Sequence, residues 1–282
     1  MHSEERIREM EPDELKADYI AKMGNDLGSQ FHVLSSDLTW VHWRWQQYRI
    51  LFGEKPSRID LLNETASFFF YVVQGVFFED TLLGIAKLIG PEESSGKQNL
   101  TVRRLPSLCK PEIQTEVSGL VDIARSKSAF AIEWRNKYIA HHDLDLALGR
   151  KSYLLPTASR EAVEHCLAAL RDVLNRVEGE YCKADTMYFS PNPWDAKALL
   201  YIVREGLRRE REKREAWNRG ERHAADLEPP EEILNAEVRV GRNHLFSPLI
   251  RRSKSGSSLH AFARPRRTGI LPQLRAVVFR RG

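Results

Sequence analysis

Cysteine is scarce in this chain and poorly placed for cross-linking. The 282 residues include three cysteines, at positions 109, 166 and 182, and no C-x-x-C pair. An odd number of widely spaced cysteines argues against a disulfide framework and against a zinc ribbon. We therefore expect reduced, mostly buried thiols, as is usual in a cytosolic protein.

Long apolar runs are also missing. The longest lies between Phe68 and Phe78, is interrupted by Gln74, and is too short to span a bilayer. The first residues, Met1 to Arg6, are polar and acidic and lack the basic start and apolar stretch of a secretory signal. The sequence predicts a cytoplasmic protein with no membrane partner.

Glycine and proline, at 16 and 13 residues, are too few to indicate a disordered chain. The hydrophobic fraction of 42% and the charged fraction of 29% are typical of a soluble globular protein with a sizeable core. Such a core needs neither disulfides nor a structural metal, and we expect no cofactor.

Acidic residues are absent from the end of the chain. Residues 241–282 contain ten Lys or Arg and no Asp or Glu, so this tail carries +10 while residues 1–240 carry −6. A basic tail can contact nucleic acid or an anionic surface, or it can simply be a solvated end. Both interpretations stay open.

Helical periodicity dominates the rest of the sequence. In the first predicted helix, 14–52, an apolar stripe repeats at steps of three and four residues, with a break or kink expected near Gly24 and Gly28. The second, 59–89, has Asp60 or Ser57 as its expected cap and is apolar nearly all round, which predicts a central position in a bundle. The stripe of the first helix comprises Leu27, Phe31, Leu34, Leu38, Val41, Trp45 and Tyr48.

Four more helices are predicted, and a polar loop is expected at 90–100. The helices are 111–125, 127–141, 160–181 (capped by Ser159 or Thr157) and 195–219. After residue 220 no period is sustained, and only two short strands, 238–240 and 276–279, are candidates. We therefore predict an N-terminal extension at 1–12, an all-α domain at 13–219 and a basic, poorly structured C-terminal tail at 220–282.

The most informative segment is Arg135-Asn136-Lys137-Tyr138-Ile139-Ala140-His141-His142-Asp143, at the end of a predicted helix. A guanidinium group can hold a phosphate by two hydrogen bonds, and an imidazole can move a proton near neutral pH. On an ideal α-helix Arg135 shares a face with His142 and not with His141. If the helix ends before His141, the following loop can instead return that histidine to Arg135, and the sequence leaves this open.

The segment and its surroundings resemble the HEPN superfamily. The HEPN signature is Arg, four to six residues, then His, and Arg135 fits it with either His141 or His142. The run Trp134–Asp143 is most similar to abortive-infection HEPN proteins of the AbiU type. The upstream order is also similar, with a Trp-rich first helix, a Phe-rich second helix and Asn99-Leu100-Thr101. The resemblance covers about residues 12 to 185 and implies an HEPN-like helical bundle.

The resemblance implies a metal-independent endoribonuclease active in phage defence or in toxin–antitoxin growth arrest. By analogy, His141, with His142 as the substitute, would assist attack of the ribose 2′-OH or protonate the leaving oxygen. Arg135 would bind the phosphate, and Asn136 would orient RNA or the histidine. The implied partners are RNA, a second copy of the chain in a homodimer, and an antitoxin or another partner protein.

Three other interpretations of the sequence remain. Cations at a helix end are favoured anyway by the helix dipole, and many HEPN-like domains are non-catalytic RNA-binding or protein-interaction modules. The run His141, His142, Asp143 and Asp145 offers metal ligands, although adjacent histidines seldom bind one ion well and no metal-binding motif frames them. A tail-driven nucleic-acid binder with a scaffold body is a third class.

Aromatic residues cluster on the first two predicted helices. Trp40, Trp43 and Trp45 lie on the first, and residues 68–71 lie on the second. Such a cluster can stack nucleic-acid bases, but helical spacing favours a place in the core or in a dimer interface.

Overall fold

The computed structural model describes residues 12–140, 144, 148, 155–188 and 194–221. The chain divides into two compact units, one of which holds the described residues up to Val203 and the other those from Arg204 onward. The described elements of the first unit are helical apart from one small hairpin, which confirms the all-α prediction. They are α1 (Pro12–Met23), α2 (Asn25–Tyr48), η1 (Arg49–Gly53), α3 (Pro56–Ile89), β1 (Glu93–Ser94), β2 (Lys97–Gln98), η2 (Val102–Arg104), α4 (Leu105–Leu108), α5 (Pro111–Lys127), α6 (Ala129–Trp134), η3 (Arg135–Ile139), α8 (Arg160–Cys182) and the start of α9 (Trp194–Asn218).

The predicted first helix is three elements, α1, α2 and the π-helical turn η1. The break falls at Gly24, whose φ of 84° lies in the left-handed region that glycine tolerates best. Gly28 then lets the start of α2 pass close to α1, because a Cβ atom there would lie 2.6 Å from the carbonyl oxygen of Tyr19. The predicted break is confirmed, and it allows α1 to fold back on α2.

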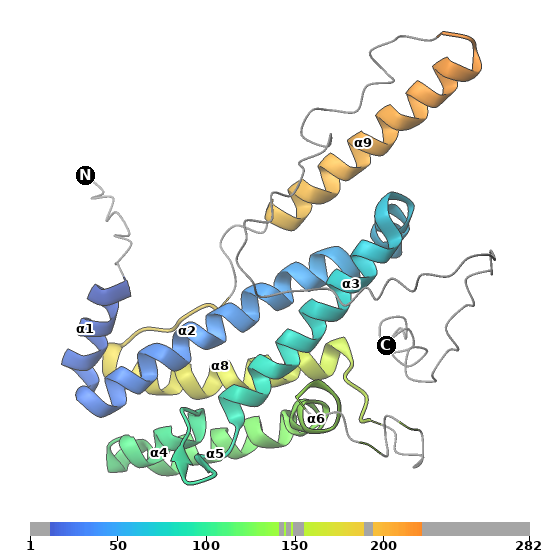
Figure 1. The fold of residues 1–282 in the computed structure, drawn as a ribbon. Coiled ribbons are helices and arrows are strands. Elements are labelled where there is room, and N and C mark those ends of the chain that lie inside the picture. Colours follow the sequence, from blue (N-terminus) through green and yellow to red (C-terminus); the bar gives the residue numbers. More distant parts are fainter. Residues whose placement is uncertain (1–11, 141–143, 145–147, 149–154, 189–193, 222–282) are drawn as a thin grey trace, which may run out of the picture. The chain divides into compact units, whose positions relative to one another are not determined.

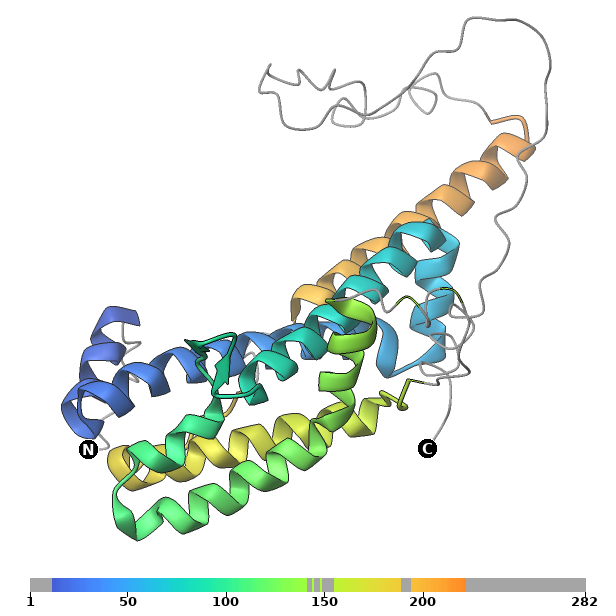
Figure 2. The same cartoon turned by 60° about the horizontal axis from the view of Figure 1, so that its bottom comes forward.

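The core lies between α2, α3, α5 and α8. Helices α5 and α8 lie side by side in both views, with α2 along the other side of α8 and α3 crossing α2 (Figures 1 and 2). Every residue of the predicted α2 stripe is buried. On α8 the apolar residues spaced at three and four positions are buried as well, namely Val163, Leu167, Leu170, Val173, Leu174 and Val177. Ser159 caps α8 as predicted, accepting a hydrogen bond from the Ala162 backbone N–H at 3.1 Å. The helical periodicity of the apolar residues therefore indicated the buried faces of α2 and α8 correctly.

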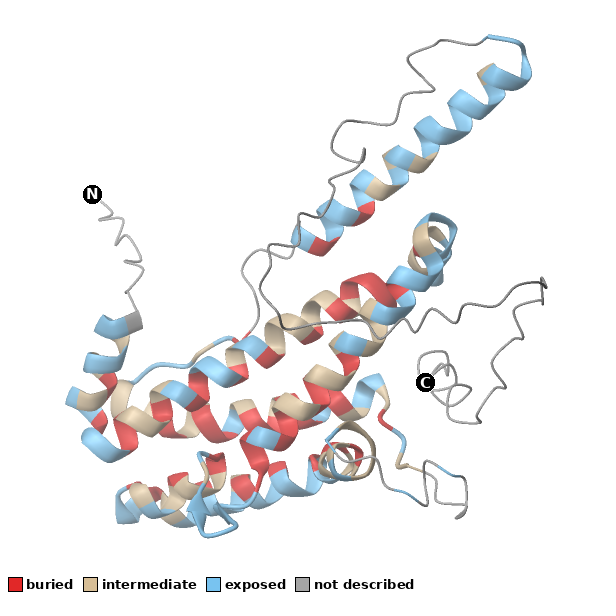
Figure 3. Cartoon of the chain, viewed as in Figure 1, coloured by how far each residue is buried: buried red, intermediate tan, exposed pale blue. Residues whose placement is uncertain are grey.

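Helix α3 has two halves with different environments, and here the prediction of a central helix is wrong. The backbone departs from helical geometry at Ala66 (φ −157°, ψ 71°). After that kink most of the apolar residues up to Val76 are exposed, with Phe70 as a buried exception, whereas from Phe78 onward the helix enters the core (Figure 3). Of the aromatic cluster, Trp45 and Phe70 are buried, but Trp40, Phe68, Phe69 and Tyr71 are exposed, so a core position is wrong for these four.

Two local predictions for the ends of α3 also need correction. The helix begins at Pro56 after Lys55, which makes no side-chain cap, so neither Ser57 nor Asp60 has the predicted role. The predicted loop at 90–100 contains the hairpin β1–β2, closed by Ser95 and Gly96 with φ of 51° and 73°. Positive φ at both positions is the signature of a type I′ turn. The two strands show no alternation of apolar and polar residues that could have predicted them.

One helix among the described residues is long and apolar enough to cross a membrane by length and composition. It is Pro56–Ile89, whose most apolar 18-residue window is 28% buried.

The charged half of α9, from Arg204, belongs to the second unit. There Arg208 bridges Glu205 and Glu212 at 3.0 and 2.6 Å, which are exposed contacts along one helix face. The tail 222–282, with its two candidate strands, lies outside the described residues. The predicted boundary at 220 stays a prediction.

Candidate functional site

Arg135 opens a wide helical turn. The predicted helix 127–141 is the α-helix α6 followed by the π-helix η3, in which the backbone N–H of Ala140 donates to the carbonyl oxygen of Arg135 at 2.8 Å. A π turn holds one residue more than an α turn, and such turns occur often at functional sites. The regular α-helix predicted here is therefore wrong from Arg135 onward.

This turn changes the question of which histidine pairs with Arg135. His142 shares a face with Arg135 only on an ideal α-helix, and the π-helical turn η3 does not have that geometry. Helix η3 ends at Ile139, before both histidines. His141 and His142 lie outside the described residues, as do Asp143 and Asp145, so the pairing stays a prediction. Of the two described site residues, Arg135 is half-buried and Asn136 is exposed.

The core side of the Arg135 turn is anchored by Trp134. Its side chain is buried, and its indole Nε1–H donates to the carbonyl oxygen of Pro156 at 2.9 Å. The ring packs edge-on against Phe78 and Tyr138, with both centroid separations 5.7 Å. Edge-to-face aromatic pairs of this kind add to the stabilisation from burial. The backbone that carries Arg135 is therefore held to α3 and to the segment before α8.

Tyr138, in the same turn, lies close to the junction of the two halves of α3. Partial burial raises the pKa of Tyr138, and the carboxylate of Glu79 and the hydroxyl of Tyr71 add to the increase. Partial burial also raises the pKa of Glu79. A tyrosine with a raised pKa remains a neutral hydrogen-bonding group at physiological pH. Tyr138 is a polar neighbour of Arg135 that the sequence did not single out.

The described part of the predicted site can bind a phosphate but does not by itself account for proton transfer. Arg135 supplies a permanent cation with a planar set of donors. The predicted proton-transfer groups are the two histidines beyond Ala140. Among the described residues no group of three or more His, Cys, Asp or Glu side chains could hold a metal ion.

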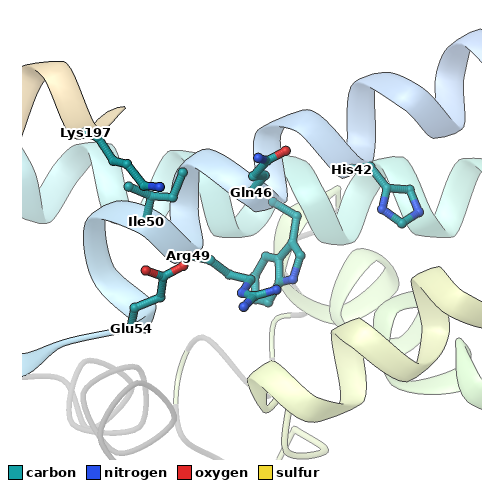
Figure 4. Close-up of a pocket in the computed structure, with 7 residues that line it drawn as sticks. His42, Gln46, Arg49, Ile50, Glu54 and Lys197 are labelled. Atoms are coloured by element: carbon teal, nitrogen blue, oxygen red, sulfur yellow. The ribbon is translucent and has the colours of Figure 1, made fainter. Parts of the chain in front are cut away.

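A second polar region lies on α2 and η1, where a pocket of about 350 Å³ opens to solvent (Figure 4). Its lining includes His42, Arg49 and Lys197, the last contributed by the start of α9. Arg49 Nε lies 3.2 Å from Glu164 Oε1, a contact that is an ion pair without hydrogen-bond geometry. His42 and Arg49 are seven residues apart on one helix face, which is the sequence signal that could have indicated this pocket.

His42 lines this pocket and is partly buried. Burial lowers its pKa to about 4, and the nearby Arg171 acts in the same direction. Its Nε2 is buried and has no hydrogen-bond partner within the part of the chain that the structure describes. At neutral pH His42 is therefore uncharged.

The pocket and the Arg135 turn are connected by a series of ring contacts. Trp45 stacks on Tyr48 at 4.9 Å, and Tyr48 contacts Phe78 at 6.0 Å, which in turn contacts Trp134. This aromatic series runs through the core from the end of α2 to α6, and Trp134 extends it to Tyr138 of η3.

Comparison with known proteins gives one match. The family model HEPN_AbiU2, described as AbiU2, matches residues 24–200 of this chain. The match includes Arg135 and the segment that follows it, and extends from the start of α2 into α9. No curated protein and no solved structure matches the chain.

Proposed function

The chain belongs to the AbiU2-type HEPN family, and from this premise we propose that it is a metal-independent endoribonuclease. Membership makes it an HEPN-type abortive-infection protein. The proposal adds RNA cleavage as its activity, in phage defence or in toxin–antitoxin growth arrest.

The observation that carries the proposal is the position of Arg135. The residue stands on a π turn whose core side is fixed by Trp134, while Asn136 beside it is exposed. A phosphate-binding side chain on a fixed backbone is what a cleavage site needs, because pre-positioned charge costs little reorganisation during the reaction.

The proposed reaction is an intramolecular transesterification at one phosphate of the RNA backbone. One histidine, His141 or its substitute His142, removes the proton from the ribose 2′-OH, and the 2′ oxygen attacks the adjacent phosphorus. The bond to the 5′ oxygen breaks, and that oxygen takes up a proton from water, leaving a 2′,3′-cyclic phosphate and a 5′-hydroxyl. Arg135 would stabilise the negative charge that develops on the phosphate, and Asn136 would orient the RNA or the histidine.

The proposal includes the expected partners and location. RNA is the substrate, the active form is a homodimer, and an antitoxin or another protein is a further partner. The protein would act in the cytoplasm without a membrane partner or a metal.

A non-catalytic HEPN-like RNA-binding or interaction module is the second candidate. The exposed aromatic residues after the kink in α3 favour it, because a surface of this kind is suited to another macromolecule. In that case Arg135 would only bind RNA or complement the helix dipole.

RNA cleavage in the presence of EDTA tests the proposal. We expect the wild type to cleave RNA and Arg135→Ala to lose about 10²-fold or more in rate, since it removes transition-state charge stabilisation. Arg125→Ala is the matched control, because Arg125 is an exposed arginine on α5 paired with Asp122 at 3.6 Å. Circular dichroism and thermal unfolding would establish that each variant is folded.

Two results would count against catalysis. One is a wild-type protein that cleaves no RNA across a broad panel, and the other is an Arg135→Ala variant as active as Arg125→Ala. RNA binding without cleavage would favour the second candidate. His141→Ala and His142→Ala, assayed side by side, would show which histidine moves the proton.

A further inference from the structure

The exposed part of α3 forms an apolar surface that we call the α3 ridge. It consists of Phe68, Phe69, Tyr71, Val72 and Val76, which are 78%, 61%, 42%, 45% and 61% exposed. Together these side chains present on the order of 500 Å² of surface to solvent. That is close to the largest apolar patch of an ordinary monomer, a size at which such patches often have a function.

We propose that the α3 ridge binds a second copy of the same ridge, with the two helices antiparallel about a two-fold axis near Val72. The inference rests on the homodimer of the proposed function and assigns it a surface. Its test measures association, so it can fail while RNA cleavage succeeds, and the reverse.

The order of residues along the ridge is self-complementary. Two-fold symmetry makes the contacts reciprocal: where residue i of one copy meets residue j of the other, residue j of the first copy meets residue i of the second. On a helix that turns about 100° per residue, the positions three and four before Val72 share its face with the positions three and four after it. The first two are Phe68 and Phe69, and the last two are Gly75 and Val76. An antiparallel pair therefore places the large rings of one copy over the small residues of the other.

A parallel pair would lack this fit. It would bring Phe68 and Phe69 against their own copies and leave Gly75 facing Gly75 across a gap. Closely packed interfaces avoid such gaps because unfilled space loses dispersion contacts. The ridge therefore favours the antiparallel arrangement.

Gly75 is the position that the proposal explains best. A Cβ atom built there has no heavy atom within 4 Å, so nothing in the described fold requires a glycine. A glycine inside a helix nevertheless costs about 1 kcal/mol relative to alanine. On the ridge, a glycine leaves room for the close approach of another backbone or an aromatic ring.

The size of the ridge fits a protein partner better than a bilayer. From residue 68 to 76 the exposed segment rises about 12 Å, less than half of the roughly 30 Å of a hydrocarbon core. The following half of α3 is committed to the core, where Leu82, Ile85 and Ile89 are fully buried. A standard interface buries about 800 Å² per partner, so the ridge supplies more than half of one share.

Surface next to the ridge can supply the rest of the interface area. Helix η3, which carries Arg135, packs on α3, the helix that carries the ridge. A partner seated on the ridge would also approach this turn.

Association of two matched glycine variants tests the proposal. Gly75→Gln adds a side chain into open space on the ridge, and Gly119→Gln does the same on α5, where a Cβ atom likewise has no heavy atom within 4 Å. Both substitutions should be tolerated by the monomer. Sedimentation equilibrium across a broad concentration range should show dimers for wild type and Gly119→Gln, and a dissociation constant weakened about ten-fold or more for Gly75→Gln.

Cross-linking tests the position of the axis. With Val72→Cys, a short bis-maleimide should join two copies, because residue 72 lies next to its own counterpart. Ile123→Cys, at a position 52% exposed on α5, and the wild type with its three native cysteines are the controls.

Three outcomes would overturn the proposal: a wild type that is monomeric at every concentration, a dimer unaffected by Gly75→Gln, or cross-linking of Ile123→Cys as efficient as that of Val72→Cys. Co-sedimentation of a monomeric wild type with phosphatidylcholine vesicles, abolished by Phe68→Asp, would assign the ridge to lipid instead. RNA cleavage measured on the same preparations keeps this result separate from the proposed activity.

Discussion

Helix α3 places nearly the same apolar composition in two environments. Residues 68–76 are mostly exposed, whereas residues 78–89 include five residues with no measurable exposure, Thr81, Leu82, Ile85, Ala86 and Ile89. The two halves differ in what packs on them: Phe78 of the second half contacts Tyr48 of α2 and Trp134 of α6, whereas the outer face of the first half is exposed (Figure 3). Apolar composition therefore indicates that a surface will be covered, and the fold alone decides whether the chain covers it itself.

The largest expected difference between the halves comes from truncation. Leu82→Ala should lower the free energy of unfolding by about 2–5 kcal/mol, because it leaves a cavity in the core. Phe68→Ala should change it by less than about 0.5 kcal/mol in the monomer, because the ring is already in water. Urea unfolding at high dilution measures both. Equal losses in the two variants would show that the first half is also covered within one chain.

Replacing one glycine in each half of α3 by alanine should change the free energy of unfolding by a smaller amount, and with opposite signs in the two halves. At Gly84 a Cβ atom would lie 2.6 Å from Val41 Cγ2, whereas at Gly75 it would meet nothing within 4 Å. Gly84→Ala should therefore destabilise by about 1–3 kcal/mol through overpacking of α2 against α3. Gly75→Ala should stabilise the monomer by about 0.5–1 kcal/mol through helix propensity. Thermal unfolding at low concentration compares them, and two changes of the same sign would contradict the comparison.

Glu79, at the junction of the halves, should give the smallest effect. Burial raises its pKa above the ordinary value of 4.5, so the folded state disfavours the carboxylate. The stability that this protonated group contributes is present below pH 4.5 and is lost as pH rises through the raised pKa. Glu79→Gln should therefore gain stability relative to wild type between pH 4 and pH 7, by less than about 1 kcal/mol because the group is partly solvated. Urea unfolding at both pH values measures the difference, and a gain independent of pH would exclude this cause.

The helical fold could be predicted well from the sequence because most helices bury one face. The stripes of α2 and α8 gave both the elements and their buried sides. The first half of α3 could not be placed in this way, since residues 68–73 are apolar on every side and no face is marked. The β1–β2 hairpin was missed because its strands are two residues long and polar, so neither alternation nor composition indicates them.

The candidate site was predictable only in part. Arg135 was found from chemistry and spacing, and the family match covers it. The π turn was not, because one added residue in a single turn leaves the apolar period of the helix almost unchanged. Tyr138 and Glu79 were missed because they lie 59 positions apart in the sequence. Only the packing of η3 on α3 brings them close together. The roles of His141 and His142 stay predictions.

The turn η3 also affects how spacing in such motifs should be counted. The backbone N–H that donates to the carbonyl oxygen of Arg135 belongs to Ala140 and not to Ile139, so the last turn of this helix contains one residue more than an α turn. A chain with one residue fewer after its arginine could close an ordinary α turn and deliver the next segment to nearly the same place. The number of residues between the arginine and the histidine then does not by itself determine the distance between their side chains. A single-residue deletion between Arg135 and Ala140 is, in this sense, a change of helix type more than a change of distance.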